Sequence, residues 1–257
     1  MPSAVHLDKL SAGYGAGDVI RDITLDIPEG TKVALAGPNG CGKTTLLRAM
    51  SGLISSSGTA EVLGHPIMSL SRRKAAGFIS LLTQYSENSF EFTVRQTVEL
   101  GCYANGGREQ DKITDEVLEQ TNLSSLADVP VSTLSGGQKQ RLFLARTLAQ
   151  RTPVLLLDEP LNHLDVRFTK EISDVLLEWA SGSTVTSDGS AHKNTLIGVY
   201  HDISMARMMS DMIVFLKDGR LVTKGNTGDI DYKSVLNDVY DMDVAAHMEQ
   251  IASLWRE

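Results

Sequence analysis

Apolar and polar residues follow each other along this chain with two different periods, and the changes of period mark out its elements. Residues 5–27 alternate apolar with polar positions on both sides of a glycine-rich turn at 13–17. A period of two predicts strands rather than a helix, so we expect two antiparallel strands joined at that turn. Short, continuous apolar runs predict buried strands at residues 32–36, 78–82, 154–158 and 195–200. The run at 154–158 is typical of a central parallel strand.

The middle of the chain has helical periodicity instead. Apolar residues recur at spacings near 3.6 over 94–103 and 113–121, and a further helix is expected over 139–150. Because strands that alternate with helices are typical of α/β folds, we expect a parallel α/β core that the helical segment interrupts.

These patterns predict a single domain over residues 1–257 with an inserted part. The α/β core, which carries an antiparallel β subdomain, is expected to consist of residues 1–84 and 152–257. Residues 85–151 are expected to form the inserted α-helical subdomain.

Three later segments complete the pattern. Residues 181–194 are polar, small and without apolar periodicity, so we expect a mobile surface loop. Residues 212–217 and 220–224 flank an Asp218-Gly219 pair, which predicts a hairpin. The tail, 235–257, is apolar at helical intervals.

A glycine-rich segment at residues 37–45, GPNGCGKTT, follows the apolar run 32–36 and precedes a helix-like stretch. In that context the glycines let backbone amides approach a ligand, and the amides and the helix N-terminus form an anion-binding site. We expect Lys43 to reach the β- and γ-phosphates of a nucleoside triphosphate and the Thr44 hydroxyl to ligate Mg²⁺. The alternative, a turn that merely resembles this pattern, is disfavoured by the strand-to-helix context. The residues expected to bind the nucleotide here are Asn39, Gly40, Cys41, Gly42, Lys43, Thr44 and Thr45.

Two adjacent acids stand at the end of the apolar run 154–158. We expect Asp158 to hold Mg²⁺ through its water shell, as the second acidic element of P-loop enzymes does. Two carboxylates at the end of a buried strand are unfavourable unless a cation or a substrate uses them. We therefore expect Glu159 to be the general base that positions and deprotonates the attacking water. A purely structural turn at 158–160 is the alternative.

The segment LSGGQ at 134–138 has two interpretations. Ser135 and Gln138 have the spacing of a helix capping box, which contributes about 1 kcal/mol. Gly136 and Gly137 would each cost about 1 kcal/mol in the first turn of a helix, so capping explains Ser135 but not the glycine pair. A helix start with open backbone access indicates a second phosphate-binding element. Because this element belongs to a separate subdomain, two chains meeting head to tail would let each close on the nucleotide of the other.

Composition limits the possible partners. The net charge of −8 and the sequence pI near 5.3 argue against broad nucleic-acid binding, which usually needs a basic surface. No apolar run approaches the roughly 20 residues of a membrane span, and the first residues lack the layout of a signal peptide. Cys41 and Cys102 form no C-x-x-C pair that would suggest disulfides or zinc. We therefore expect the protein to reside in the reducing cytoplasm. Any membrane role must come through a partner chain.

Taken together, the motifs resemble those of ABC-transporter ATPases over nearly the whole chain. They are GPNGCGKTT at 37–45, Gln84, LSGGQKQR at 134–141, VLLLDEP at 154–160, LNHLD at 161–165 and His201. The resemblance implies a P-loop NTPase core of the RecA-like type. It also implies an ATP-sandwich homodimer with two composite sites.

The resemblance further implies roles for single residues. Tyr14 would stack on adenine, although an aromatic residue packed on a hairpin is the alternative for that position. Gln84 would sense Mg²⁺ and the γ-phosphate at the junction with a transmembrane partner, and His201 would be the switch histidine on that phosphate. Asp165 would communicate across the dimer, and residues 135–138 would contact the opposite subunit's γ-phosphate.

Softer features are similar to the ATPases of importers for iron-siderophores, haem and cobalamin. They include residues 13–30, 92–94 and 239–244. This similarity implies transmembrane permease subunits and, indirectly, a substrate-binding protein as partners, with no nucleic acid. It places the chain at the cytoplasmic face of the cell membrane.

Three alternatives to an importer remain open. They are a soluble ATPase of the same superfamily, such as an iron–sulfur cluster assembly factor, the ATPase of an exporter, and a nucleotide-gated scaffold that does not hydrolyse. Intact Glu159 and His201 argue against the scaffold.

Two features depart from the usual family pattern. Segment 181–194 is longer than usual before the strand that leads to His201, and it could be a tether, a regulatory site or an inert insertion. The thiol of Cys41 is unusual chemistry for the glycine-rich loop, although cysteine is a common variant at this position in the family. If its thiol faces the phosphate loop, ATP should slow its alkylation by maleimide.

Overall fold

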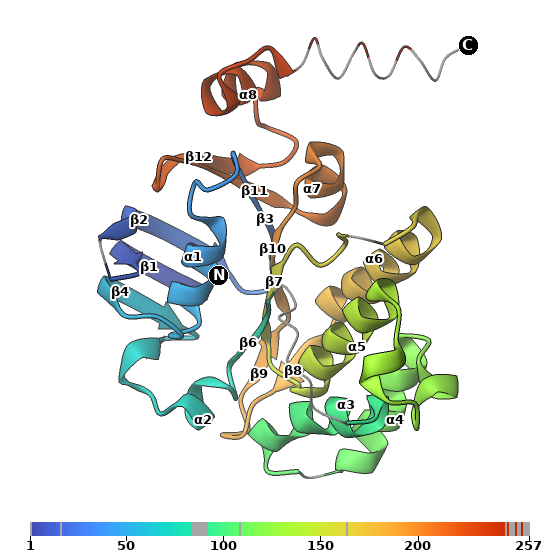
Figure 1. Cartoon of the computed structure of the whole chain (residues 1–257). Coiled ribbons are helices and arrows are strands. Elements are labelled where there is room, and N and C mark those ends of the chain that lie inside the picture. The colour runs from blue at the N-terminus through green and yellow to red at the C-terminus, as the bar shows by residue number, and fades with distance from the viewer. Residues whose placement is uncertain are drawn as a thin grey trace.

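The computed structural model describes residues 2–15, 17–83, 92–107, 109–162 and 164–244, together with residues 246, 250 and 253. Its central sheet contains β3 (Lys32–Ala36), β6 (Ile79–Leu82), β7 (Val154–Asp158), β10 (Thr195–Val199), β11 (Met212–Lys217) and β12 (Arg220–Asn226). The strand order is β12-β11-β3-β10-β7-β6 (Figure 1). Five strands run parallel and β12 pairs antiparallel with β11 at the edge. The four predicted buried strands and the hairpin at Asp218-Gly219 are confirmed.

A second, antiparallel sheet lies on one side of the first. It is built from β1 (Ser3–Gly13), β2 (Asp18–Pro28), β4 (Ser56–Val62) and β5 (His65–Pro66), in the order β2-β1-β4-β5. The two predicted antiparallel strands within 5–27 are therefore confirmed. Together the two sheets give the α/β fold with an antiparallel part that the sequence predicts.

Helices cover the central sheet from both sides (Figure 1). The α-helices are α1 (Lys43–Met50), α2 (Arg72–Ala75), α3 (Val94–Cys102), α4 (Gln110–Gln120), α5 (Gly136–Ala149), α6 (Val166–Ser181), α7 (Ile203–Met209) and α8 (Tyr232–Tyr240). Short 3-10 turns are η1 (Ile67–Ser69), η2 (Tyr103–Asn105), η3 (Ser124–Leu126) and η4 (Val131–Thr133). None of the helices in the described parts of the chain is both long and apolar enough to cross a bilayer.

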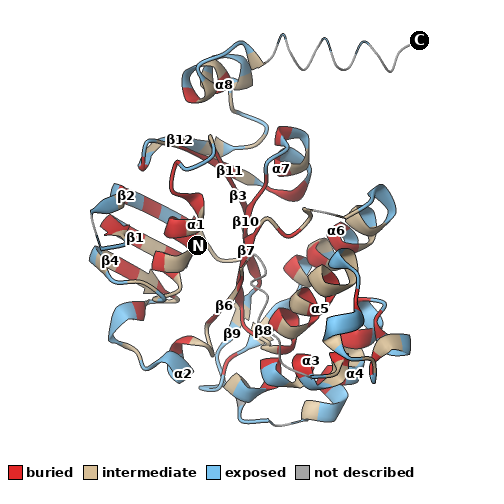
Figure 2. Cartoon of the chain, in the orientation of Figure 1, coloured by how far each residue is buried: buried red, intermediate tan, exposed pale blue. Residues whose placement is uncertain are grey.

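The five parallel strands of the central sheet are buried on both faces, because side chains along them alternate between two hydrophobic cores (Figure 2). Val33, Leu35 and Leu156 face the core shared with α1 and the antiparallel sheet. Leu155 and Leu157 face the core shared with helices α3 to α8. Helices α1 and α5 therefore pack against opposite faces of one sheet.

The prediction of a mobile loop at 181–194 is wrong. Residues Ser183–Val185 (β8) and Ala191–Lys193 (β9) pair as a hairpin. The turn between them is held by Asp188, whose Oδ1 accepts hydrogen bonds from the Thr186 hydroxyl at 2.6 Å and the Ser190 amide at 2.9 Å. These bonds lower the pKa of Asp188 to about 2. Side-chain hydrogen bonding thus orders a segment that has no apolar periodicity.

Two helix boundaries also differ from prediction. Helix α5 begins at Gly136 rather than at residue 139, because Ser135 caps it. In the predicted helical tail, α8 starts at Tyr232 and ends at Tyr240. Most of the tail beyond 244 lies outside the described residues.

Candidate functional site

The glycine-rich loop connects β3 to α1 and depends on glycine at its two ends. Gly37 has φ 144° and Gly42 has φ 106°, which is left-handed backbone that disfavours side chains. A Cβ at Gly37 would lie 2.1 Å from the carbonyl oxygen of Leu216, and one at Gly42 would lie 2.6 Å from Ile20. Asn39 and Gly40, at the middle of the loop, are exposed. The loop thus presents its backbone on its outer side while its ends pack closely against neighbouring strands.

The ammonium group of Lys43 is buried within this loop. Its Nζ donates hydrogen bonds to the carbonyl oxygens of Gly37 at 2.7 Å and Pro38 at 2.8 Å. The Cys41 sulfur lies 3.8 Å from the same nitrogen, so the thiol faces the inside of the loop, where it is 5% exposed. Burial raises the pKa of the Cys41 thiol, and the nearby Lys43 opposes that shift. Thr45, the last residue of the predicted set, is buried in α1.

Thr44 and Asp158 meet beside the loop, as their predicted shared role requires. The Thr44 hydroxyl donates to Asp158 Oδ1 at 3.0 Å. Asp158 is buried, and burial raises the pKa of its carboxyl group, with a smaller contribution in the same direction from Glu159. The Thr44 hydrogen bond opposes this shift. A buried carboxylate next to a hydroxyl supplies the hard oxygen donors that Mg²⁺ prefers.

Glu159 and His201 also lie together, although they are far apart in sequence. The distance from His201 Nε2 to Glu159 Oε1 is 2.5 Å, and Asn162 Nδ2 donates to Glu159 Oε2 at 2.5 Å. Glu159 has φ 57°, so its backbone adopts the left-handed conformation at the point where β7 ends. The three side chains share a hollow of about 230 Å³ with Asp202. This cluster holds the carboxylate of Glu159 at an open site.

Two polar residues near Glu159 are absent from the predicted set. Asn162 contacts its carboxylate, and Gln140 of α5 donates through Nε2 to the carbonyl oxygen of Pro160 at 3.1 Å. Asn162 stands three residues after Glu159 in a turn, and this spacing is the signal that could have revealed it. Gln140 belongs to a distant element; it falls within the LSGGQKQR motif at 134–141, but nothing in that motif points to a contact with Pro160.

The LSGGQ segment forms the capping box that its spacing predicts. Ser135 Oγ accepts from the Gln138 amide at 3.3 Å, and Gln138 Oε1 accepts from the Ser135 amide at 2.8 Å. A Cβ at Gly136 would meet no atom within 4 Å, and one at Gly137 would make only an ordinary 3.5 Å contact with Leu164. Packing within the described chain therefore does not explain the glycine pair.

Tyr14 and Asp165 belong to two different parts of the structure, the antiparallel sheet and the start of α6. Tyr14 follows β1 in the turn toward β2, is 48% exposed, and accepts a hydrogen bond from Arg48 at 3.0 Å. Asp165 caps α6, where its Oδ1 accepts from the Phe168 amide at 2.9 Å. Gln84 lies outside the described residues, and so does His163 of the LNHLD segment.

The structure thus brings some predicted residues together and keeps others apart. Five of them lie at or beyond the carboxyl ends of β3, β10 and β7, which stand side by side in that order: Lys43, Thr44, Asp158, Glu159 and His201. The LSGGQ segment begins α5, on the opposite face of the sheet from α1. Within one chain, the second predicted phosphate-binding element is therefore separate from the first.

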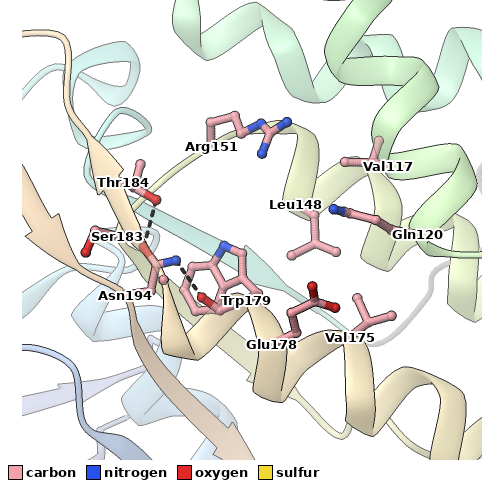
Figure 3. Close-up of a pocket in the computed structure, with 11 residues that line it drawn as sticks. Val117, Gln120, Leu148, Arg151, Val175, Glu178, Trp179, Ser183, Thr184 and Asn194 are labelled. Atoms are coloured by element: carbon pink, nitrogen blue, oxygen red, sulfur yellow. Dashed lines mark hydrogen bonds between the residues drawn. The ribbon is translucent and has the colours of Figure 1, made fainter.

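A different pocket, of about 200 Å³, lies at the far ends of α5 and α6 (Figure 3). Arg151, Glu178 and Trp179 line it together with the hairpin residues Ser183 and Thr184. Asn194 fastens the hairpin there, since it donates to the carbonyl oxygen of Trp179 at 2.6 Å and accepts from Thr184 at 2.7 Å. None of the predicted site residues lines this pocket.

Comparison with known proteins identifies the family of this chain. The family model described as ABC transporter matches residues 20–162. The chain is 33% identical over 247 residues to the probable siderophore transport system ATP-binding protein YusV of Bacillus subtilis (strain 168), covering 93% of this chain and 86% of the relative. It is 35% identical over 232 residues to the cobalamin import ATP-binding protein BtuD of Halobacterium salinarum (strain ATCC 29341 / DSM 671 / R1). That match covers 88% of this chain, which spans 56% of BtuD.

A solved structure agrees with these matches. The dimeric post-hydrolysis state of the ATP-binding cassette MJ0796, bound to ADP and Pi, superimposes with a TM-score of 0.75 at 27% identity. The match covers 87% of this chain and 98% of that one. From the family match, the near full-length relatives and the shared fold, the chain belongs to the ABC transporter family and is one of its ATP-binding ATPases.

Proposed function

We propose that this chain is the ATP-hydrolysing subunit of an importer for an iron-siderophore, haem or cobalamin. The observation that carries the ATPase part is the cluster of Glu159, Asn162 and His201 beside the Thr44–Asp158 pair. The relatives named for siderophore transport and cobalamin import support the importer part.

ATP would bind along the glycine-rich loop. The amides of residues 39–45 are the donors for its phosphates, and Tyr14 offers an exposed ring for adenine. In the structure, Lys43 Nζ donates hydrogen bonds to the carbonyl oxygens of Gly37 and Pro38. In the proposed complex Lys43 Nζ donates to β- and γ-phosphate oxygens instead. These hydrogen bonds are stronger because the phosphate acceptors are charged.

The residues present fit Mg²⁺. The Thr44 hydroxyl and the Asp158 carboxylate would hold it, with Gln84 as the further proposed ligand. When bound, Mg²⁺ neutralises charge on the phosphates during transfer. A buried carboxylate whose pKa is raised by burial is stabilised in its charged form by a cation, which fits the environment of Asp158.

Glu159 is the proposed general base. Its Oε2 accepts a hydrogen bond from Asn162 and its Oε1 lies 2.5 Å from His201, so the carboxylate is oriented by two neighbours. A positioned base contributes about 10²–10⁴-fold to the rate. His201 would exchange its contact with Glu159 for the γ-phosphate, and Gln84 would report on the same phosphate.

Two chains would form a head-to-tail dimer around two ATP molecules. Ser135, Gly136, Gly137 and Gln138 of each chain would close on the γ-phosphate bound by the other, and Asp165 would contact the partner across the interface. The support is the open space at Gly136, the separation of α5 from α1, and the dimeric state of MJ0796. Residues 85–151 would move as a helical subdomain during this closure.

Permease subunits would bind around Gln84 and the first part of the helical subdomain, roughly residues 85–97. A groove of about 420 Å³ opens beside β6, the strand that precedes Gln84, and is lined by Leu53, Met68 and Leu81, of which Leu53 and Met68 are exposed. An apolar helix of the permease fits this lining, and its binding would hold the ATPase at the cytoplasmic face of the membrane. A substrate-binding protein would act indirectly, from the other side of the permease.

Purification of the chain from its native cells with a crosslinkable tag tests this proposal. We expect a polytopic membrane protein to co-purify in the presence of detergent, and Leu53→Asp together with Met68→Asp to abolish its recovery while ATP binding persists. Recovery of a soluble assembly complex instead would favour the iron–sulfur type of ATPase. ATP binding without hydrolysis in the complete complex would favour the scaffold.

A further inference from the structure

Helix α5 carries a buried arginine in the second turn after its LSGGQ start. Arg141 is 6% exposed, and its Nε has no hydrogen-bond partner in the described part of the chain. Burial lowers the pKa of Arg141, and the carboxylates of Glu171 and Asp165 oppose that shift. A buried charge at such a position is unfavourable unless specific partners stabilise it.

One set of partners lies at the end of α4. Arg141 Nη1 donates to the carbonyl oxygens of Asn122 at 3.2 Å and Thr121 at 3.5 Å. Helix α4 has no basic residue in its own last turn. Arg141 therefore supplies, from a different helix, the positive charge that a helix C-terminus attracts.

The other partner lies at the start of α6. The guanidinium carbon of Arg141 is 4.3 Å from the centroid of the Phe168 ring, within the range of a cation–π contact. The backbone amide of Phe168 donates in turn to the Asp165 carboxylate. Arg141 thus touches the residue that holds Asp165 in place.

We propose that Arg141 is a positioning residue that fixes the spacing between Ser135 on α5 and Asp165 on α6. Both residues belong to the surface that would close on the partner chain, so this inference rests on the proposed head-to-tail dimer. If the spacing is rigid, the segments that carry Ser135 and Asp165 contact the partner chain together. Dimerisation then loses less conformational entropy, because neither segment has to be ordered separately.

The planar guanidinium suits this task better than an ammonium group. It donates at its edge to the α4 carbonyl oxygens while its face lies on Phe168. A lysine could neutralise the end of α4 but could not do both. The conservative replacement Arg141→Lys therefore distinguishes a role of Arg141 in folding from a role in positioning Ser135 and Asp165.

The test measures ATP-dependent dimerisation by light scattering in chains that also carry Glu159→Gln. Arg141→Met and Phe168→Leu are each expected to raise the protein concentration needed for dimerisation by about tenfold. Binding of a fluorescent ATP analogue to the monomer should change less than about twofold, because the glycine-rich loop is untouched. Arg141→Lys should recover the thermal stability lost in Arg141→Met without recovering dimerisation.

Arg146→Met is the matched control. Arg146 lies on the same helix and stacks on Phe143, 4.9 Å from its centroid, rather than on α6. It should leave dimerisation near that of Glu159→Gln alone. If Arg141→Met does not fold, Phe168→Leu decides the matter, since it keeps the bonds to α4.

The failures are distinguishable. If Glu159→Gln itself forms no dimer with ATP, the proposed function is overturned and this inference with it. If that dimer forms normally and Arg141→Met or Phe168→Leu leaves it unchanged, or if Arg146→Met weakens it equally, only the role of Arg141 is overturned.

Discussion

Replacement of Gly136 by alanine separates the two interpretations of the LSGGQ segment. Gly136 is the first residue of α5, its backbone is helical, and a Cβ there would meet nothing within 4 Å. Alanine is favoured over glycine in a helix by about 0.5–1 kcal/mol. For a chain of this size, that corresponds to a rise in Tm of about 1–4 °C. Gly136→Ala should therefore stabilise the protein without nucleotide.

The same methyl group should impair the ATPase. In the proposed dimer it would stand between the α5 amides and the phosphate bound by the partner, so we expect a fall in kcat of about tenfold or more. Thermal unfolding without nucleotide and steady-state phosphate release measure the two effects on one sample. Gly228→Ala is the control, because a Cβ at Gly228 also meets open space but lies away from α5. A stabilised Gly136→Ala protein with unchanged ATPase would refute the second phosphate-binding role.

Three further predictions concern the site itself. Glu159→Gln should lower kcat by about 10²–10⁴-fold while an ATP-bound dimer accumulates, whereas Glu178→Gln on α6 should not; near wild-type turnover in Glu159→Gln would exclude it as the base. Because burial raises the pKa of the Asp158 carboxyl group, the folded state binds this proton more tightly than the unfolded chain does. The stability that the proton adds is lost as the pH rises through the folded-state pKa. Asp158→Asn should thus raise the Tm at pH 7 by about 2–4 °C, remove this loss of stability with rising pH, and abolish hydrolysis; an unchanged Tm profile would contradict this. Alkylation of the buried Cys41 by maleimide should be slow, faster at higher pH, and slower again with ATP; equal rates with and without ATP would place its thiol away from the nucleotide.

Local sequence was sufficient for the glycine-rich loop. A strand, glycines, Lys43 and a helix are contiguous in the chain, and the structure keeps this order from β3 to α1. The Thr44–Asp158 contact follows from one further step, because β7 ends at Asp158. Both depend on elements that periodicity identifies directly.

The Glu159–His201 pair could be reached only through resemblance. It depends on β10 lying next to β7, with Val199 paired to Asp158, so that the residues after both strands emerge side by side. Apolar runs indicate buried strands but not their order. The contact of Arg141 with Phe168 likewise depends on how α5 packs against α6, which no local pattern reports.

The hairpin at 183–193 was missed for a different reason. Its strands have three residues each, too short for a period of two to be visible. The available signals were β-branched Thr184 and Val185 and the polar turn at 187–189. Hydrogen bonds that Asp188 accepts and Asn194 donates, rather than apolar burial, order this segment.

The central claim is that each ATP is bound between the glycine-rich loop of one chain and the LSGGQ segment of another. Mixing two inactive variants, Lys43→Ala and Ser135→Arg, tests it most directly. Mixed dimers then contain one site with both defects and one intact site. The account predicts that each variant alone is inactive and that the equimolar mixture recovers about a quarter of the wild-type ATPase. A mixture no more active than its two components would contradict it.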